Sequence, residues 1–299
     1  MKSTGSWYEV VADDQQHYAC RTKGKLRLEG IKETNPVAVG DWVTFELEDK
    51  NGVISEILPR KNHILRQAVK KTGHSHVLAA NVDQVVLLAT LKQPRTSLGF
   101  IDRFLVSAES FRIPQVLIFN KTDLLSPDEK DEQEALLLLY NRLGVHAMGL
   151  CAIQDDLHFL DQILKNKVTL MAGHSGVGKS TLLNRLSPDI LQTIGKISEF
   201  SNKGIHTTTF AEMFQLNENT FIIDTPGVKE WGLVNMDQQE ISDYFPEMRD
   251  RRLNCKFGSR CLHINEPKCA IIDAVQKDEI ARSRYESYLS MVIGEDNRK

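Results

Sequence analysis

The most restrictive feature of this 299-residue sequence is the octapeptide GHSGVGKS at 173–180, which directly follows the apolar run 168–172. Glycine, four residues and then Gly-Lys-Ser is the pattern of a loop that carries a buried strand into a helix. The glycines let successive backbone N–H groups converge on phosphate oxygens, and the N-terminus of the helix points at the same anion. The octapeptide therefore predicts an α/β sheet that binds a phosphorylated ligand.

The residues of this loop are expected to have separate roles. Lys179 would neutralise the β and γ phosphates, and Ser180 would offer its hydroxyl oxygen to Mg²⁺. The candidate nucleotide-binding residues of this segment are Gly173, His174, Ser175, Gly176, Val177, Gly178, Lys179, Ser180 and Thr181.

Asp224 lies at the end of a second apolar run, 220–223, and is followed by Thr-Pro-Gly. At the carboxyl end of a strand its carboxylate can hold Mg²⁺ through water, and the N–H of Gly227 can meet the γ-phosphate. Asp-Thr-Pro-Gly alone is an ordinary turn. About fifty residues after a phosphate loop, it becomes a second nucleotide signal.

A third segment indicates which base is bound. Asn120, Lys121, Thr122 and Asp123 follow the apolar run 115–119. The carboxylate of Asp123 can accept hydrogen bonds from N1–H and the exocyclic amine of guanine. Adenine would leave buried polar groups unpaired at this position, so the motif favours GTP over ATP.

The region that holds these motifs alternates apolar runs with helical patterns. The runs are at 85–91, 115–119, 145–150, 168–172 and 220–223, and 128–143 has helical periodicity. This alternation is typical of a parallel sheet with helices on both faces. The base-reading segment precedes the phosphate loop here, the reverse of the common GTPase order. Because the loops need only meet at one sheet edge, the order predicts a circularly permuted GTPase domain.

The N-terminal part has short β-like runs at 7–11, 17–22, 42–47 and 53–57 with turn residues between them. This spacing predicts a five-stranded oligonucleotide-binding barrel (OB-fold), although a β-appendage that only packs against its neighbour stays open. The stretch 57–82 has no acidic residue. It is either a solvated linker or a phosphate-backbone footprint, and its basic residues are Arg60, Lys61, Arg66, Lys70 and Lys71.

The C-terminal part concentrates three of the five cysteines beside a histidine, at Cys255, Cys261, His263 and Cys269. An odd, clustered set without a secretion signal favours metal over disulfides. Four soft or borderline ligands fill a tetrahedral Zn²⁺ site and leave no position for a substrate, so we expect a structural zinc. Reduced cysteines packed there by chance are the alternative. The stretch 273–292 has a helix-like pattern.

Composition limits the partners of the chain. Its formal net charge is −3, so any nucleic acid must be met by a local patch. The apolar runs fall far short of the roughly 20 residues of a spanning helix, and we expect a cytoplasmic protein with no membrane partner.

On these motifs the chain resembles the ribosome small subunit-dependent GTPase A family of bacteria over nearly its whole length. The resemblance implies an OB-fold RNA-binding domain at 1–66, a permuted GTPase domain at 67–234 and a zinc-binding helical domain at 235–299. It also implies GTP hydrolysis stimulated by the 30S subunit, and a role in late maturation of that subunit. Cys151 and Ala152 stand where the family often has Ser-Ala behind the guanine base.

The family motif GIHTTT occupies 204–209, in the loop expected to close over the γ-phosphate. We expect Thr208, rather than Thr207, to complete the Mg²⁺ shell. Val228 stands where many GTPases lead to a water-orienting glutamine, so we assign water positioning to His206, with Lys179 as the second catalytic residue. The alternative is that His206 is simply an exposed switch residue.

The motifs thus predict a monomeric GTPase that binds GTP and GDP, with Mg²⁺ and one Zn²⁺, and the resemblance implies the 30S subunit and 16S rRNA as its partners. Two other functions stay open. One is an RNA-binding scaffold with a structural, slowly hydrolysed GTP. The other is a GTPase for tRNA or the large subunit.

Overall fold

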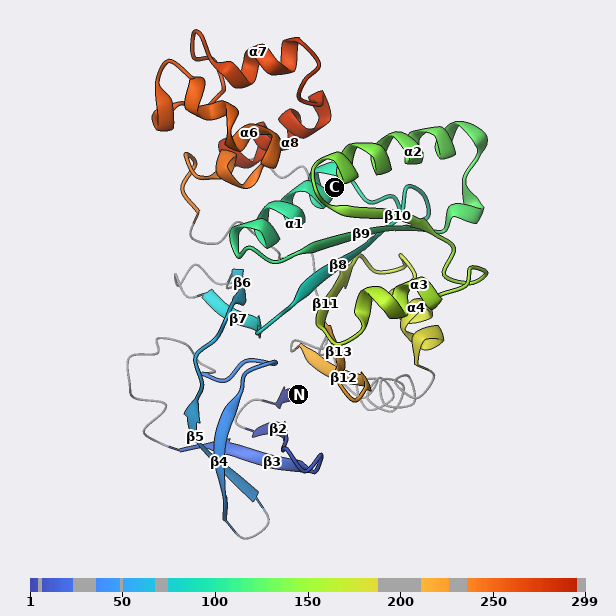
Figure 1. Ribbon diagram of the computed structural model, residues 1–299, viewed down its shortest axis with the longest axis vertical. Helices are drawn as coiled ribbons and strands as arrows, with labels where there is room; N and C mark the ends of the chain where they lie inside the picture. The colour runs from blue at the N-terminus through green and yellow to red at the C-terminus, as the bar shows by residue number, and fades with distance from the viewer. Residues whose placement is uncertain are drawn as a thin grey trace. The chain divides into compact units, whose positions relative to one another are not determined.

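The computed structural model describes residues 1–4, 7–23, 36–48, 51–67, 75–187, 211–225 and 236–294 (Figure 1). It consists of two compact units. The first unit contains Met1–Val86, Ala152–Ala172 and Gly178–Glu230, and the second contains Leu87–Cys151, Gly173–Val177 and Trp231–Lys299. The boundaries between the units fall after Val86, after Cys151, on either side of Gly173–Val177 and after Glu230.

The N-terminal strands of the first unit confirm the β-rich prediction. Cys20 and Gly52 pair in parallel between the strands His17–Thr22 and Asn51–Ile57, and the other neighbouring strands are antiparallel. The buried core formed by these strands and the segment before Val43–Glu48 contains Tyr8, Cys20, Val37 and Ile54. In spatial order the strands are β1 (Lys2–Thr4), β2 (Trp7–Val11), β3 (His17–Thr22), β5 (Asn51–Ile57) and β4 (Val43–Glu48).

The stretch 57–82 contains β-structure, so the interpretation as a solvated linker is wrong for its described residues. β6 (His63–Gln67) and β7 (Ser75–Ala80) form an antiparallel pair. Two of the basic residues are already neutralised, because Arg60 binds the buried carboxylate of Asp41 at 2.6 Å and Lys61 pairs with Asp83. Lys70, Lys71 and the side chain of Arg66 lie outside the described residues.

The first unit also contains strands of the nucleotide-binding sheet. β11 (Val168–Gly173) lies parallel to β13 (Thr220–Asp224), which pairs antiparallel with β12 (Glu212–Asn217). β1 pairs with the start of β12, where the Lys2 ammonium binds Glu212 at 3.0 Å. The N-terminal strands therefore continue this sheet through main-chain pairing. Among its described residues, this part has the helices α3 (His158–Leu164) and α4 (Lys179–Leu186).

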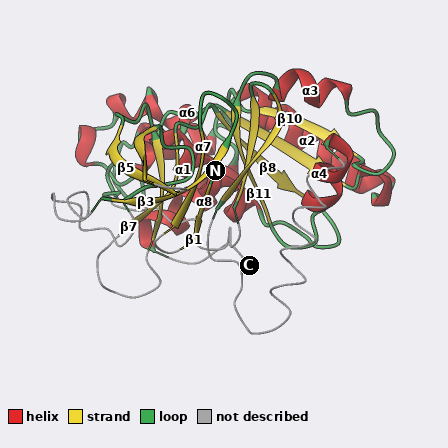
Figure 2. Ribbon diagram, turned by 90° about the horizontal axis from the view of Figure 1, so that it is seen from below, coloured by secondary structure: helices red, strands yellow, loops and turns green. Residues whose placement is uncertain are grey.

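The second unit contains β10 (His146–Leu150), its parallel neighbour β9 (Gln115–Asn120) and the second half of the next strand, β8 (Gln84–Ala89). All six β8 residues are buried, as expected for a strand covered on both faces. α1 (Leu98–Ser110) packs beside β9 (Figure 1), and α2 (Pro127–Arg142) packs beside β10 (Figures 1 and 2). A capping box between Ser126 and Glu129 starts α2, which confirms the helix expected at 128–143.

The C-terminal part of the second unit is helical, and no strand is described within 236–294. The helical stretch expected at 273–292 is two helices. The first helix ends at its C-cap residue Lys277, because the next residue, Asp278, adopts a left-handed conformation at φ 57°. The elements are η4 (Ile241–Tyr244), α6 (Pro246–Arg249), η5 (Arg251–Asn254), η6 (Gly258–Arg260), α7 (Ala270–Gln276) and α8 (Arg282–Ile293). No helix in the described ranges is long and apolar enough to span a membrane.

Gly52 gives a test of the N-terminal core. A Cβ at this position would collide with Cys20 Sγ and lie 2.8 Å from Phe45 Cδ2. We expect Gly52→Ala to lower the free energy of unfolding by about 1–3 kcal/mol, measured by urea denaturation. The exposed Glu56 lies on the same strand, and Glu56→Ala should stay within about 0.5 kcal/mol of the parent. Equal stability of the Gly52 variant and the parent would contradict this packing.

Candidate functional site

The phosphate loop connects β11 to α4, as the sequence predicts. Gly173 ends the strand, and Lys179 is the first residue of the helix. A side chain at Gly173 would place its Cβ 2.6 Å from the carbonyl oxygen of Leu88 on β8, so only glycine allows this approach. Gly178 has a left-handed φ of 98°, which an L side chain rarely adopts. The loop conformation therefore depends on its glycines.

Asn120 joins the base-reading segment to the phosphate loop within the second unit. It is the last residue of β9, only 3% exposed, and its Nδ2 donates a hydrogen bond to the carbonyl oxygen of Val177 at 2.7 Å. Burial makes this bond costly to lose, because the amide and the carbonyl would both be left unpaired. Two segments that lie 57 positions apart in sequence are thus held together, as predicted.

The rest of the base-reading segment turns sharply after β9. Lys121 has a left-handed φ of 63°, and its ammonium group donates a hydrogen bond to the carbonyl of Gln93. The following 3₁₀ turn, η2 (Thr122–Leu124), leaves the Asp123 carboxylate exposed and able to accept hydrogen bonds from a ligand. The contact with Gln93 had no sequence signal, because the acceptor is a main-chain carbonyl.

In the first unit the end of β13 meets the start of α4. The Lys179 ammonium forms an ion pair with the carboxylate of Asp224. Ser180 is exposed at the N-terminus of the same helix, as is Thr181. A carboxylate and a hydroxyl are hard oxygen donors, the ligand type that Mg²⁺ prefers, so Asp224 and Ser180 fit this ion.

Cys151 and Ala152 directly follow β10 and are both buried. Within the first unit, Arg185 of α4 donates hydrogen bonds to the carbonyls of Ala152 at 3.0 Å and Asp155 at 2.9 Å. The segment after β10 is therefore fixed to the helix that begins at the phosphate loop.

Several predicted site residues lie outside the described residues. They belong to segments 188–210 and 226–235 and are His206, Thr207, Thr208, Gly227 and Val228. Their assignments stay predictions.

The C-terminal part brings its four predicted ligands together. Cys255, Cys261, His263 and Cys269 are all buried, and their ligand atoms lie within 4.8 Å of one another. His263 Nδ1 is 3.3 Å from Cys269 Sγ and 3.6 Å from Cys255 Sγ, and the two sulfurs are 3.8 Å apart. A tetrahedral zinc with Zn–S near 2.3 Å separates its ligand atoms by about 3.6–3.8 Å. The geometry fits a zinc site filled entirely by protein ligands.

Protonation at this cluster follows from burial. Desolvation raises the pKa of the Cys269 thiol to about 12 and lowers the pKa of the His263 imidazole to about 4. At neutral pH, Cys269 thus holds its proton and the imidazole is neutral. A bound cation must displace the thiol proton, so metal affinity should rise with pH.

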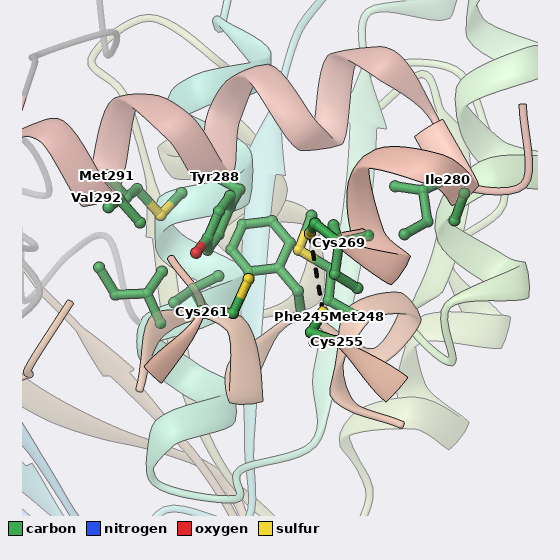
Figure 3. Packing of buried hydrophobic residues seen from close by; sticks show 13 residues of the cluster. Phe245, Met248, Cys255, Cys261, Cys269, Ile280, Tyr288, Met291 and Val292 are labelled. Carbon is green, nitrogen blue, oxygen red and sulfur yellow. Dashed lines mark hydrogen bonds between the residues drawn. The ribbon is translucent and has the colours of Figure 1, made fainter. Parts of the chain in front are cut away.

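Three side chains that are not metal ligands hold the segment 255–269, which carries the four ligands and is called the ligand loop below. Tyr285 and Tyr288 of α8 donate hydrogen bonds to the carbonyls of His263 at 2.6 Å and Leu262 at 2.8 Å. The Glu266 carboxylate accepts hydrogen bonds from several main-chain N–H groups of the same loop, at Leu262, Ile264 and Asn265. Figure 3 shows Tyr288 beside Phe245 and the cysteines. Sequence reasoning missed these three supporting residues, because their bonds go to the backbone.

Together, a strand-to-helix phosphate loop preceded by an asparagine-anchored base segment and followed by Asp224 define a circularly permuted P-loop GTPase. Known protein families support this class. The sequence model of the family called RsgA N-terminal domain matches residues 1–54, and the sequence model of the family called RsgA GTPase matches residues 57–234. The chain belongs to the RsgA GTPase family and is a GTP hydrolase, which confirms the resemblance seen in the sequence.

The chain is similar to two curated proteins called "Small ribosomal subunit biogenesis GTPase RsgA". It is 49% identical to the protein from Christiangramia forsetii, with 99% of this chain and 95% of the relative covered. It is 46% identical to the protein from Bacteroides fragilis, with 100% and 97% covered.

Two solved structures share the fold. One is YjeQ from Thermotoga maritima, with a TM-score of 0.76, 33% identity, and 98% of this chain and 95% of that chain covered. The other is YloQ, described as a circularly permuted GTPase, with a TM-score of 0.73, 29% identity, and 100% and 94% covered. The permuted order predicted from the motifs is confirmed.

The metal cluster can be tested by ligand removal. We expect about one zinc per chain in protein purified without chelator. Cys261→Ala removes a direct ligand. Zinc affinity, measured by chelator competition, should therefore fall by more than the roughly 10- to 100-fold lost when a residue that only hydrogen-bonds a ligand is removed. Cys20→Ala, also at a buried cysteine, is the matched control and should keep its zinc. Absence of metal in the parent would contradict the assignment.

Proposed function

We propose that this chain is a GTP-driven switch in the late maturation of the small ribosomal subunit, with hydrolysis stimulated by the 30S subunit. The hydrogen bond from Asn120 to Val177 supports nucleotide binding, since it holds a base-reading segment against a phosphate loop. The ribosomal role is supported by full-length similarity to relatives whose name is small ribosomal subunit biogenesis GTPase.

The proposed guanine contact is made by Asp123, whose exposed carboxylate would accept hydrogen bonds from the base. Backbone N–H groups of the phosphate loop and Lys179 bind the phosphates. The whole proposed GTP site comprises Asn120, Lys121, Thr122, Asp123, Cys151, Ala152, Gly173, His174, Ser175, Gly176, Val177, Gly178, Lys179, Ser180, Thr181 and Gly227.

The residues proposed to hold Mg²⁺ are Ser180, Asp224 and Thr208. Bound there, the ion would offset charge on the phosphate oxygens. Lys179 supplies a second, fixed positive charge. His206 is proposed to orient the attacking water, because Val228 has no polar group for this task. Subunit binding would then fix His206 in position, so we expect turnover by the protein alone to be slow.

We infer a division into three parts, with an RNA-binding part at 1–66, the GTPase part at 67–234 and a zinc-binding part at 235–299. The zinc is structural, because four protein ligands leave no open position. We propose that the chain is a cytoplasmic monomer that contacts 16S rRNA. The RNA contact would be carried by basic residues other than Arg60 and Lys61, which have acidic partners.

Base selection is tested at Asp123. Asp123→Asn should lose at least 10-fold in GTP affinity and gain affinity for xanthosine triphosphate, because an amide donor suits the C2 carbonyl of xanthine. Binding is measured by calorimetry. The control Asp128→Asn removes another exposed carboxylate in the first turn of α2 and should bind GTP like the parent. Unchanged base preference in Asp123→Asn would remove Asp123 from the base site.

The ribosomal step is tested by GTP turnover with separated small and large subunits at stated salt. We expect stimulation by the small subunit only. His206→Ala should bind GTP and the subunit normally but lose roughly 10²-fold or more of the stimulated rate. Negligible turnover with either subunit would favour a scaffold with a structural GTP, and stimulation by the large subunit alone would reassign the partner.

A further inference from the structure

Helix α1 is buried on nearly every side. Nine of its thirteen residues are buried, including the charged Asp102. A helix that packs on a sheet normally shows one polar face to water. Here the side away from the strands packs against α8 of the C-terminal part, within the same unit. α1 therefore lies between the sheet and the zinc-binding part.

The N-terminal turn of α1 touches the phosphate loop. The Phe100 ring, 1% exposed, lies against the imidazole of His174, with the ring centroids 4.0 Å apart. His174 directly follows Gly173, whose Cα is already close to β8. Because this interior is tightly packed, a shift of Phe100 must displace the loop or open a cavity.

Two residues further along, α1 holds α8 through buried charge. Arg284 Nη1 donates to Asp102 Oδ1 at 2.6 Å, and its Nε donates to Glu247 at 2.7 Å. The Tyr140 hydroxyl donates to the same Asp102 oxygen at 2.8 Å. Burial disfavours the charged form of Arg284, but the two carboxylates outweigh this and raise its pKa. The guanidinium therefore stays charged, and it also lies 4.5 Å from the centroid of the Phe245 ring.

An apolar contact reinforces this connection. Val106 of α1 belongs to the same buried cluster as Phe245, Tyr288 and the three cysteines of the metal cluster. The ligand loop, α8 and α1 therefore share one core. A change of packing at one of them alters the space available to the others.

We propose that Arg284 and Phe100 are positioning residues for nucleotide binding, through which α1 couples the phosphate loop to the zinc-binding part. Arg284 fixes α1 from one side, and Phe100 fixes His174 from the other. The coupling goes beyond the proposed function because it requires nucleotide at the phosphate loop but no ribosomal subunit. By linkage, nucleotide binding must in turn stabilise α8.

The first test measures GDP affinity of the full-length protein. Arg284→Met and Phe100→Leu should each weaken GDP binding by roughly 5-fold or more, the lower range of measured site couplings. Arg282→Met is the matched control, since Arg282 lies on the same helix, is exposed and pairs only with Glu286 in the described chain. It should bind GDP like the parent. Phe100→Leu leaves the Arg284 network intact, so it decides the question even if Arg284→Met fails to fold.

The second test measures amide hydrogen exchange of α8 with and without saturating GDP. In the parent, GDP should slow exchange in α8 by about 5-fold or more relative to β3 of the first unit, which serves as the reference for global stabilisation. In Phe100→Leu this extra protection should be lost. If Phe100 had a merely structural role, the Phe100→Leu variant would be less stable but would keep the extra protection of α8 by GDP.

The outcomes separate this coupling from the proposed function. A parent that does not bind GDP contradicts the nucleotide site itself. A parent that binds GDP without extra protection of α8, or a Phe100→Leu variant with parental affinity, overturns the coupling and leaves the nucleotide site standing.

Discussion

The hydrogen bond from Asn120 to the carbonyl of Val177 is the contact on which the nucleotide site depends. It holds the base-reading segment and the phosphate loop together although they leave different strands. Gly173 makes this possible, because it lets the loop pass directly against the carbonyl of Leu88. Since both contacts are buried, the strands that carry Asn120 and Leu88 fix the conformation of the phosphate loop. Chain order then matters little, and a permuted sequence can build the same site.

The C-terminal part solves a different physical problem. About sixty residues of short helices enclose a small core, in which three cysteines take the place of larger apolar side chains. A metal held by Cys255, Cys261, His263 and Cys269 would add folding energy that such a core lacks. Tyr285 and Tyr288 connect α8 to the ligand loop, and Arg284 connects the same helix to α1. Metal site and GTPase sheet thus share one set of packed helices.

The basic stretch 57–82 shows why charge counted along a sequence is a poor guide to a surface. Its lack of acidic residues favoured a linker or a phosphate footprint. In the structure Arg60 and Lys61 face Asp41 and Asp83, one of which lies before the stretch and the other just beyond it. The β6–β7 pair was hidden because its strands are short and mix polar with apolar residues. Sequence composition does not record which charges already have partners.

The sequence by itself determined the chemistry, because phosphate loops, base-reading carboxylates and Cys/His clusters need particular residue types at short spacings. It also determined most strands, whose apolar runs are local. Only the tertiary structure decided that β1 pairs with β12 and that Asp102 meets Arg284, 182 positions away. Such contacts leave no periodic trace in the sequence. Their partners are chosen by packing and by the need to pair every buried polar group.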